Sequence, residues 1–182
     1  MVARELARAG HSVVVLEEGA HVPREQYAAM SPTTALRTLA REAGLGLAFG
    51  LGDTPVMSVM AGKCVGGSSV LTGGVCFRIP DDVLHEWSTH LRLDGMSPDA
   101  LAPHFDAIER DLGVDVVPEH MRSRSTQLFV EGADKLGVAM KSLRRNTPGC
   151  KGASRCNFGC PNGAKMSVDD ALLAEARERG AV

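Results

Sequence analysis

The chain has 182 residues and a net charge of −2, with 44% hydrophobic and 23% charged residues, which is the composition of an ordinary globular domain. The small net charge and the aromatic content of 4% argue against a nucleic-acid partner, because neither a basic surface nor a base-stacking platform can be built. No apolar run reaches the length of a membrane span, and the N-terminus lacks the apolar core of a signal peptide, so we expect neither.

The first 17 residues predict a helix followed by a strand and an acidic residue. An amphipathic helix over 1–9 ends at Gly10; its apolar face comprises Val2, Ala3, Leu6, Ala7 and Ala9, and its polar face Arg4, Glu5 and Arg8. The β-branched run 13–16 is typical of a strand buried on both faces of a parallel sheet, and Glu17 stands at its end. This order is that of the second half of a dinucleotide-binding βαβ unit, whose terminal acid binds a ribose. The alternative is an ordinary helix–strand pair with a surface glutamate.

Further elements follow from turn signals and capping residues. Residues 20–31 are predicted as a loop, and residues 32–43 as a helix with Ser31 as N-cap and Pro32 in the first turn. A short strand is predicted near 56–60, and glycine-rich sequence follows it over 62–78. The remaining helices are predicted over 81–91, 98–112 (capped by Ser97), 127–136 and 167–179, with a cysteine-containing loop over 146–164.

The segment GKCVGGSSVLTGGVCFRIP, over 62–80, is the strongest candidate for ligand binding. Gly66 and Gly67 lack β-carbons, so the backbone there can approach a flat or charged ligand closely. Ser68 and Ser69 add hydroxyl groups and backbone amides that suit an anion. The alternative is a pair of tight turns around a buried strand.

Four stretches in a fixed order resemble the flavin-binding part of the glucose–methanol–choline (GMC) oxidoreductases. ARELARAGHSVVVLEEG resembles the family's first helix and second strand, and GKCVGGSSVLTGGVCFRIP resembles its first signature, closing here with Arg78. VLHEWSTH with DALAPHFDAIERDLGV, and then CNFGCPNGAKMSVDDALLAEARERGAV, are similar to the helices and the cysteine-containing G-A-K segment that follow. The resemblance implies an α/β fold, namely a partial Rossmann-like FAD-binding domain with helical insertions.

The resemblance also implies a cofactor, FAD, and the residues that would bind it. These are Glu17 at the ribose and, along the flavin and its diphosphate, Gly62, Gly66, Gly67, Ser68, Ser69, Thr72 and Gly73. The family usually has asparagine at the position of Thr72, so a side-chain amide contact is in doubt there. We expect a single incomplete FAD-binding domain over 1–182, with the first strand and glycine loop upstream of Met1. The catalytic histidine would lie past Val182, so no catalytic residue is assigned here.

The implied activity is FAD-dependent oxidation of a CH–OH donor, an alcohol, sugar or sterol-like molecule, by a parent enzyme of which this chain is an inactive fragment. An electron-acceptor protein is a further candidate partner. Two alternatives stay open: a non-catalytic remnant or binding module, and an NAD-dependent Rossmann enzyme, since a terminal acid also suits NAD. The glycine-serine segment argues against the second, because a simple NAD fold does not need it.

The cysteines and the basic residues around them raise a separate question. Five cysteines without a secretion signal favour reduced thiols and a cytoplasmic location. Cys150, Cys156 and Cys160 follow the spacing C-x5-C-x3-C in a stretch, 135–165, that contains basic residues and no acid, which favours thiolates. An iron–sulfur cluster is the alternative to a structural role, but three cysteines match no standard run, and we assign no metal site. Lys165 and Ser167 would contact a phosphate or a loop backbone, or Ser167 would cap the last helix with Asp170.

Overall fold

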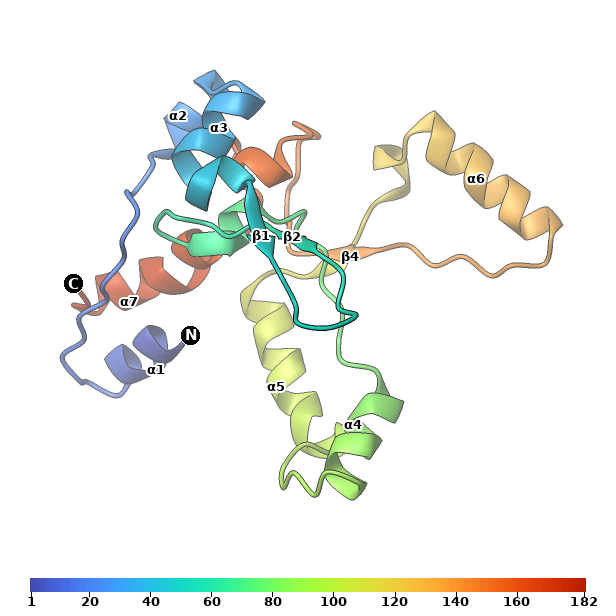
Figure 1. Cartoon of the computed structure of the whole chain (residues 1–182), viewed down its shortest axis with the longest axis horizontal. Coiled ribbons are helices and arrows are strands. Elements are labelled where there is room, and N and C mark those ends of the chain that lie inside the picture. Colours follow the sequence, from blue (N-terminus) through green and yellow to red (C-terminus); the bar gives the residue numbers. More distant parts are fainter. The chain divides into compact units, whose positions relative to one another are not determined.

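The computed structural model describes residues 1–182, which divide into two compact units. Unit 1 consists of Met1–Gly74 and Gly149–Val182, and unit 2 consists of Val75–Pro148. Unit 1 is therefore built from two segments separated in sequence by unit 2 (Figure 1). The extent of one FAD-binding domain over 1–182 stays a prediction.

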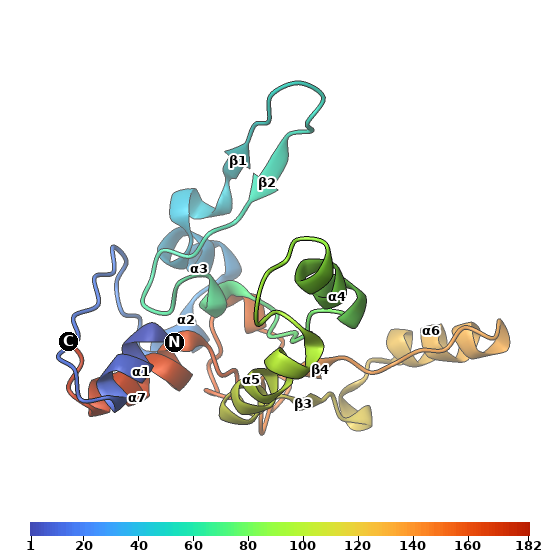
Figure 2. The same ribbon diagram turned by 90° about the horizontal axis from the view of Figure 1, so that it is seen from below.

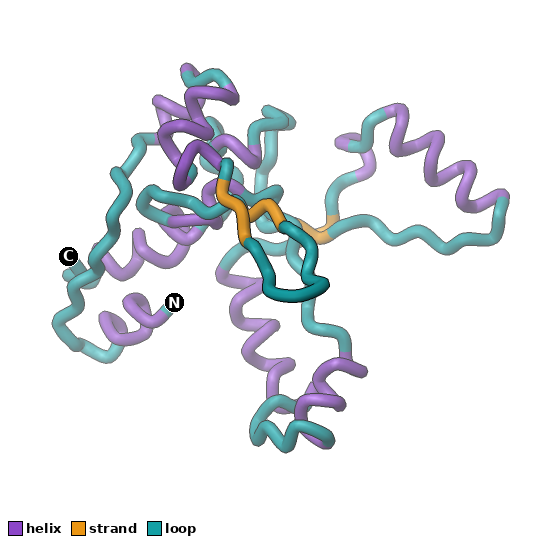
Figure 3. Tube along the Cα trace, in the orientation of Figure 1, coloured by secondary structure: helices purple, strands orange, loops and turns teal.

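Helices, short strands and long connections make up both units, as the tube in Figure 3 shows. Unit 1 contains α1 (Val2–Arg8), α2 (Arg24–Ala29), α3 (Pro32–Leu39), η1 (Arg41–Gly44), β1 (Gly46–Ala48), β2 (Met57–Val59), η2 (Gly67–Leu71), η4 (Cys156–Phe158), η5 (Asp169–Leu173) and α7 (Ala174–Glu178). Unit 2 contains α4 (Asp81–Thr89), α5 (Pro98–Asp111), β3 (Asp115–Val116), η3 (Glu119–Met121), α6 (Arg124–Lys135) and β4 (Arg144–Arg145). The predicted mixture of helix and strand is confirmed. No helix combines the length and apolarity needed to cross a membrane.

Capping side chains set several of the predicted helix starts. The hydroxyl oxygen of Ser31 accepts the Thr34 N–H at 3.1 Å, and that of Ser97 accepts the Ala100 N–H at 3.2 Å, so both predicted caps are confirmed. The helix predicted over 127–136 begins earlier than expected, because Ser123 caps it by accepting the Thr126 N–H at 3.2 Å. The loop predicted over 20–31 was wrong in part, since α2 occupies its second half.

The strand predicted at 13–16 forms only two backbone hydrogen bonds of a parallel pair, both with Val182. The Val182 N–H donates to the Val13 carbonyl at 3.0 Å, and the Val15 N–H donates to the Val182 carbonyl at 2.7 Å, which is the bonding pattern of a parallel ladder centred on Val14. The expected burial on both faces was wrong, because Leu16 is 93% exposed and only Val13 is buried. Other residues of the chain cover this segment only at Val13, which packs with Ala7, Ala176 and Ala181, so a short ladder is all that forms.

The sheets are two separate antiparallel ribbons. The strands β1 and β2 pair with Leu47 opposite Ser58, and β3 pairs with β4 with Val116 opposite Arg144. The strand predicted near 56–60 is β2, and its partner β1 was not predicted, because glycines in and around β1 resemble a loop. The β1–β2 ribbon projects from unit 1 in Figure 2. Gly46 is needed in β1, because a β-carbon there would lie 2.5 Å from the Val59 carbonyl oxygen.

Helices α1 and α7 pack side by side in unit 1, as Figures 1 and 2 both show. Their contact is a small core of Ala7, Val13, Ala176 and Ala181. The predicted polar face of α1 was wrong at Arg4, which is 5% exposed and lies against Glu5 at 2.9 Å and Glu175 at 4.0 Å. Small alanines on both helices bring the axes close, so the aliphatic stem of Arg4 becomes part of the buried surface.

The main core of unit 1 lies under the glycine-rich segment. It is formed by eight buried residues: Val22, Tyr27, Ala35, Leu39, Ala40, Cys64, Val70 and Leu71. Two glycines near the cysteines leave room for side chains at the edge of this core. A β-carbon on Gly159 would collide with the Tyr27 ring, and one on Gly163 with the Arg24 guanidinium. The core therefore fixes the segment that carries most of the candidate site.

An ion network holds together unit 2. Arg78 donates to both carboxylate oxygens of Glu109 at 2.9 and 2.6 Å and to Asp106 at 2.6 Å. Arg144 donates to the same two oxygens of Glu109 at 2.7 and 3.0 Å. These hydrogen bonds from Arg78 and then Arg144 lower the pKa of Glu109 to about 2. The arginine that closes the glycine-rich segment thus has a structural role, tying the start of unit 2 to α5.

Candidate functional site

The glycine-rich segment forms a tight turn that leads into one short helix. Gly66 and Gly67 have positive φ angles of 96° and 57°, a conformation that L-residues with side chains rarely adopt. The helix η2 begins directly at Gly67, and the Ser68 hydroxyl oxygen accepts the Gly62 N–H at 2.9 Å across the turn. A β-carbon on Gly62 would overlap the backbone of Gly67 and Ser68. Four of the predicted site residues, Gly62, Gly66, Gly67 and Ser68, are therefore brought together.

The turn after Glu17 lies against the same segment. Ala20 and Cys64 form a parallel bridge, and a β-carbon on Gly19 would overlap the backbone of Lys63 and Cys64. The side chain of Glu17 is exposed, and one carboxylate oxygen accepts the Gly19 N–H at 2.9 Å. Glu17 is thus held beside the glycine-rich segment, and its second carboxylate oxygen makes no hydrogen bond to the protein.

The remaining predicted residues take different positions around η2. The Ser69 hydroxyl donates to the Gly66 carbonyl at 2.7 Å and accepts the Val168 N–H at 2.9 Å. The Thr72 hydroxyl donates to the Ser69 carbonyl at 3.1 Å. The threonine that stands where the family usually has asparagine therefore bonds back to η2. Beyond it, Gly73 has only the Asn157 side chain near its missing β-carbon, at 3.7 Å. Ser69 and Thr72 are therefore engaged within the fold, whereas space for a ligand remains beside the α-carbon of Gly67.

Lys165 is a residue of this region whose role the sequence left undecided. Its side chain is 1% exposed, and its ammonium donates to the carbonyl oxygens of Val70 at 2.6 Å, Thr72 at 3.0 Å and Cys156 at 2.6 Å. Of the two predicted contacts, a phosphate or a loop backbone, the structure shows the backbone. The sequence feature that pointed to Lys165 was its place in the G-A-K stretch, which lies next to the cysteine loop.

The start of the last helix is capped from outside the segment that forms it. Ser69 accepts the Val168 N–H, which takes the position that the sequence had given to Ser167. Asp170, the expected second partner of that cap, lies 3.0 Å from Arg24 of α2 instead. The prediction of a cap by Ser167 with Asp170 was therefore wrong, because the cap is Ser69 of the glycine-rich segment, whose hydroxyl accepts the Val168 N–H.

Two buried groups next to the segment hold their protons more tightly than usual. Burial, followed by the nearby carboxylates of Asp169 and Glu17, raises the pKa of the Cys64 thiol to about 11. Burial also raises the pKa of the Tyr27 hydroxyl, with Asp169 adding to the effect. Both groups are neutral at pH 7, so neither Cys64 nor Tyr27 acts as an anionic nucleophile or base.

The cysteine loop packs under η2 without gathering its thiols around a common point. Cys150, Cys156 and Cys160 form no disulfide and are partly buried, and no three His, Cys, Asp or Glu side chains of the chain are placed to hold a metal ion. The helical turn η4 contacts η2 and α3. The loop's position is set by backbone contacts, of which the bond from Lys165 to Cys156 is one.

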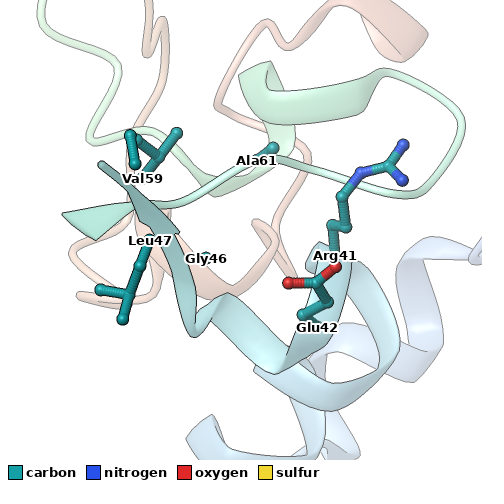
Figure 4. Close-up of a pocket in the computed structure, with 7 residues that line it drawn as sticks. Arg41, Glu42, Gly46, Leu47, Val59 and Ala61 are labelled. Atoms are coloured by element: carbon teal, nitrogen blue, oxygen red, sulfur yellow. The ribbon is translucent and has the colours of Figure 1, made fainter. Parts of the chain in front are cut away.

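A cavity of about 270 Å³ opens at the base of the β1–β2 ribbon (Figure 4). It is lined by Arg41, Glu42, Gly46, Leu47, Ala48, Val59 and Ala61. Figure 4 shows the Arg41 guanidinium pointing away from Leu47 and Val59, and Arg41 pairs with Glu18 outside the cavity. None of the predicted cofactor residues lines it, so it is a separate feature of the surface.

The comparison with protein families decides what kind of chain carries this site. The family model described as GMC oxidoreductase matches residues 10–182. The chain belongs to the GMC oxidoreductase family. The match to this GMC family runs through Glu17, the glycine-rich segment, unit 2 and the G-A-K stretch, which are the parts on which the resemblance depended.

Individual GMC relatives come from bacteria and plants. A GMC-type oxidoreductase of Mycobacterium tuberculosis is 38% identical over 181 residues, and one of Sinorhizobium fredii is 34% identical over 179 residues. A long-chain-alcohol oxidase of Arabidopsis thaliana is 30% identical over 183 residues. These alignments cover 98 to 100% of this chain but 28%, 34% and 24% of the three relatives, so the chain spans about a third of their length or less.

The geometry around η2 fits a flavin dinucleotide as the GMC cofactor. A β-carbon on Gly67 would meet nothing within 4 Å, so a ligand can approach the α-carbon there, while the Gly67 N–H donates to the Cys64 carbonyl at 2.7 Å. Ser68 and Glu17 are both exposed, and the Ala20–Cys64 bridge joins the turn after Glu17 to the segment that contains Ser68. Backbone amides with a hydroxyl suit a phosphate, and a carboxylate suits ribose hydroxyls. The donor set therefore matches both polar parts of FAD.

Proposed function

We propose that this chain is the FAD-binding part of an oxidoreductase that oxidises the CH–OH group of an alcohol. The observation that carries the proposal is the bridge between Ala20 and Cys64, which sets the turn after Glu17 beside the glycine-rich segment. Membership of the GMC family supports FAD, and the names of the plant relatives support an alcohol as substrate. Bound FAD would supply the hydride acceptor, and the residues of this chain would bind and orient it.

The Rossmann-like arrangement is part of the same proposal. The parallel hydrogen bonds of Val182 with Val13 and Val15 support a sheet in which this segment is one of several parallel strands. Val14 and Leu16 project to the same face of an extended segment and are 69 and 93% exposed, which suits a strand whose open apolar face packs against a further element of such a sheet. Glu17 then follows the carboxyl end of that strand, where such sheets bind nucleotides.

The proposed roles divide the predicted residues into two groups. Glu17 would accept hydrogen bonds from the ribose, while the Gly66–Gly67 backbone and the Ser68 hydroxyl would face the diphosphate. Ser69 and Thr72 support this surface from behind, because their hydroxyls already bond to Gly66, Val168 and Ser69. Gly62 packs closely against the backbone of Gly67 and Ser68, and a contact of Gly73 with the cofactor stays a prediction. A cytoplasmic location and an electron-acceptor partner stay predictions.

Titration with dinucleotides tests the proposal. FAD added to the chain is expected to change flavin fluorescence and visible circular dichroism, and NAD at the same concentrations is expected to leave the protein's hydrogen exchange unchanged. Equal responses to the two dinucleotides, or exchange protection from NAD alone, would instead favour the NAD-dependent alternative. Absence of any response to either would favour the non-catalytic binding module.

A further inference from the structure

Three side-chain contacts tie the glycine-rich segment to sequence that lies more than 90 positions further along the chain. Lys165 reaches the Val70 carbonyl across 95 positions and the Thr72 carbonyl across 93, and Ser69 reaches the Val168 N–H across 99. All of these residues belong to unit 1, and unit 2 is inserted between them in sequence. The conformation of the candidate site therefore depends on the returning segment of unit 1.

The ammonium of Lys165 is placed where η2 ends. Its two contacts on η2, the carbonyls of Val70 and Thr72, are among the last acceptors of that short helix, which have no partner inside it. A cation at a helix C-terminus is stabilising, and an ammonium has three N–H donors. The ammonium also donates to the Cys156 carbonyl, so it joins the end of η2 to η4.

A buried lysine whose ammonium donates to three backbone carbonyls acts differently from a lysine that binds an anion. Removing the ammonium would take the donor from the Val70 carbonyl in a buried contact and from the Thr72 carbonyl in a partly buried one, and buried acceptors without partners are costly. Removing an exposed lysine would do nothing of this kind. Since Val70 and Leu71 are 1% and 3% exposed, solvent replaces the lost donor poorly at Val70.

We propose that Lys165 is the positioning residue of the cofactor site, holding η2 and so the Gly66–Ser68 surface in its binding conformation. This proposal rests on the proposed FAD function, because the surface that Lys165 holds is the one assigned to the diphosphate. The residue does not touch the cofactor in this assignment. It acts through Val70 and Thr72, while Ser69 fixes the same helix from its other end through Gly66 and Val168.

Hydrogen exchange of the chain without any ligand provides the first test. In Lys165→Met, amides of 66–74 and 155–159 are expected to exchange at least about tenfold faster, because hydrogen bonds to a charged group contribute more than neutral ones. Amides of α1 and α5 should keep their wild-type rates. The matched control is Lys151→Met, an exposed lysine of the same loop, which should change neither region. Unchanged rates at 66–74, or an equal increase in α5, would contradict the proposal.

Rescue by a small amine separates the ammonium from simple packing. Lys165→Ala is expected to regain slow exchange at 66–74, and any FAD affinity that wild type shows, on addition of n-butylammonium but not of n-butanol. Rescue by both compounds equally would mean that filling the space is what matters, and rescue by neither would mean that an ammonium in this space does not restore the segment; either result would overturn the role of the charge. If wild type shows no response to FAD, the proposed function fails, while the exchange result still decides the role of Lys165.

Acetylation of the wild-type chain provides a measurement that needs no variant, in case the substituted chains do not fold. Lys165 is expected to resist acetylation while the other four lysines, Lys63, Lys135, Lys141 and Lys151, react, because these four are exposed. Along a urea series, acetylation of Lys165 should rise together with exchange at 66–74. Acetylation of Lys165 while 66–74 stays protected would overturn the proposal.

Discussion

The Ser69 hydroxyl oxygen lies 2.9 Å from the Val168 N–H and 2.7 Å from the Gly66 carbonyl oxygen. A single side chain therefore caps the start of the last helix and closes the turn that contains Gly66. Both bonds are partly buried, so water replaces them poorly. The glycine-serine signature and the G-A-K signature, which look independent in the sequence, form one structural element.

Ser69→Ala is expected to lower the free energy of unfolding by about 1–2 kcal/mol, because one helix cap and one internal hydrogen bond are lost together. Urea unfolding followed by far-ultraviolet circular dichroism measures this loss. The control is Ser58→Ala on the exposed strand β2, which should change stability by less than about 0.5 kcal/mol. Equal effects of the two substitutions would show that the Ser69 bonds do not contribute.

Local signals in the sequence were sufficient for most helices. Ser31 and Ser97 are side-chain caps next to prolines, and that chemistry depends only on neighbouring residues, so the starts of α3 and α5 were predictable. The β1 strand was not, because its glycines resemble a loop and its partner β2 supplies the hydrogen bonds. The prediction that 13–16 is buried on both faces was wrong for a similar reason, because burial depends on other elements that pack against the run.

Long-range side-chain contacts limited prediction of the site in the same way. Placing Glu17 beside the glycine-rich segment required only the family resemblance, and the Ala20–Cys64 bridge agrees with it. The partners of Lys165 and Ser69 lie more than 90 positions away, and spacing within one segment carries no information about them. A single sequence therefore indicated which residues matter near η2 but not which of them face a ligand and which support it.

Gly66 offers a test in which backbone strain and steric conflict can be separated. Gly66 and Gly180 have nearly equal φ angles of 96° and 92°, but only at Gly66 would a β-carbon lie 2.6 Å from the Asp169 carboxylate. At Gly180 it would meet nothing within 4 Å. Gly180→Ala should cost about 1–2 kcal/mol from the left-handed backbone alone. Gly66→Ala should cost about 2–4 kcal/mol, because overpacking adds to the strain.

Unfolding in urea, measured for both alanine variants side by side, gives the difference between them. A cost at Gly66 equal to that at Gly180 would mean that Asp169 moves away freely. Gly66→Ala is also expected to weaken any FAD response more than Gly180→Ala does, because Gly66 lies in the proposed diphosphate surface.

Glu17→Ala tests the proposed ribose contact. The substitution removes a charge-assisted hydrogen bond worth about 1.5–3 kcal/mol, so FAD affinity should fall about tenfold to a hundredfold. The matched control is Glu18→Ala, which removes the same charge one residue later and breaks an exposed ion pair with Arg41. Exposed pairs contribute little, so the control should keep its affinity. A loss of stability with unchanged FAD affinity would make Glu17 a structural residue that only caps Gly19.

The pKa of Glu109 predicts how the stability of unit 2 changes as the pH falls. Its pKa of about 2 in the folded chain lies below the usual value near 4.3, so its stabilising effect is complete above that value and is lost as the pH falls toward 2. The single tryptophan, Trp87, lies in α4 and reports on unit 2 through its fluorescence. Urea midpoints at low ionic strength should therefore fall between pH 5 and pH 3 in the wild-type chain. Glu109→Gln should be less stable at pH 6 and lose part of this pH dependence, whereas Glu119→Gln, whose side chain is 86% exposed, should keep the wild-type profile. Superimposable profiles for Glu109→Gln and wild type would show that the bonds from Arg78 and Arg144 do not stabilise unit 2.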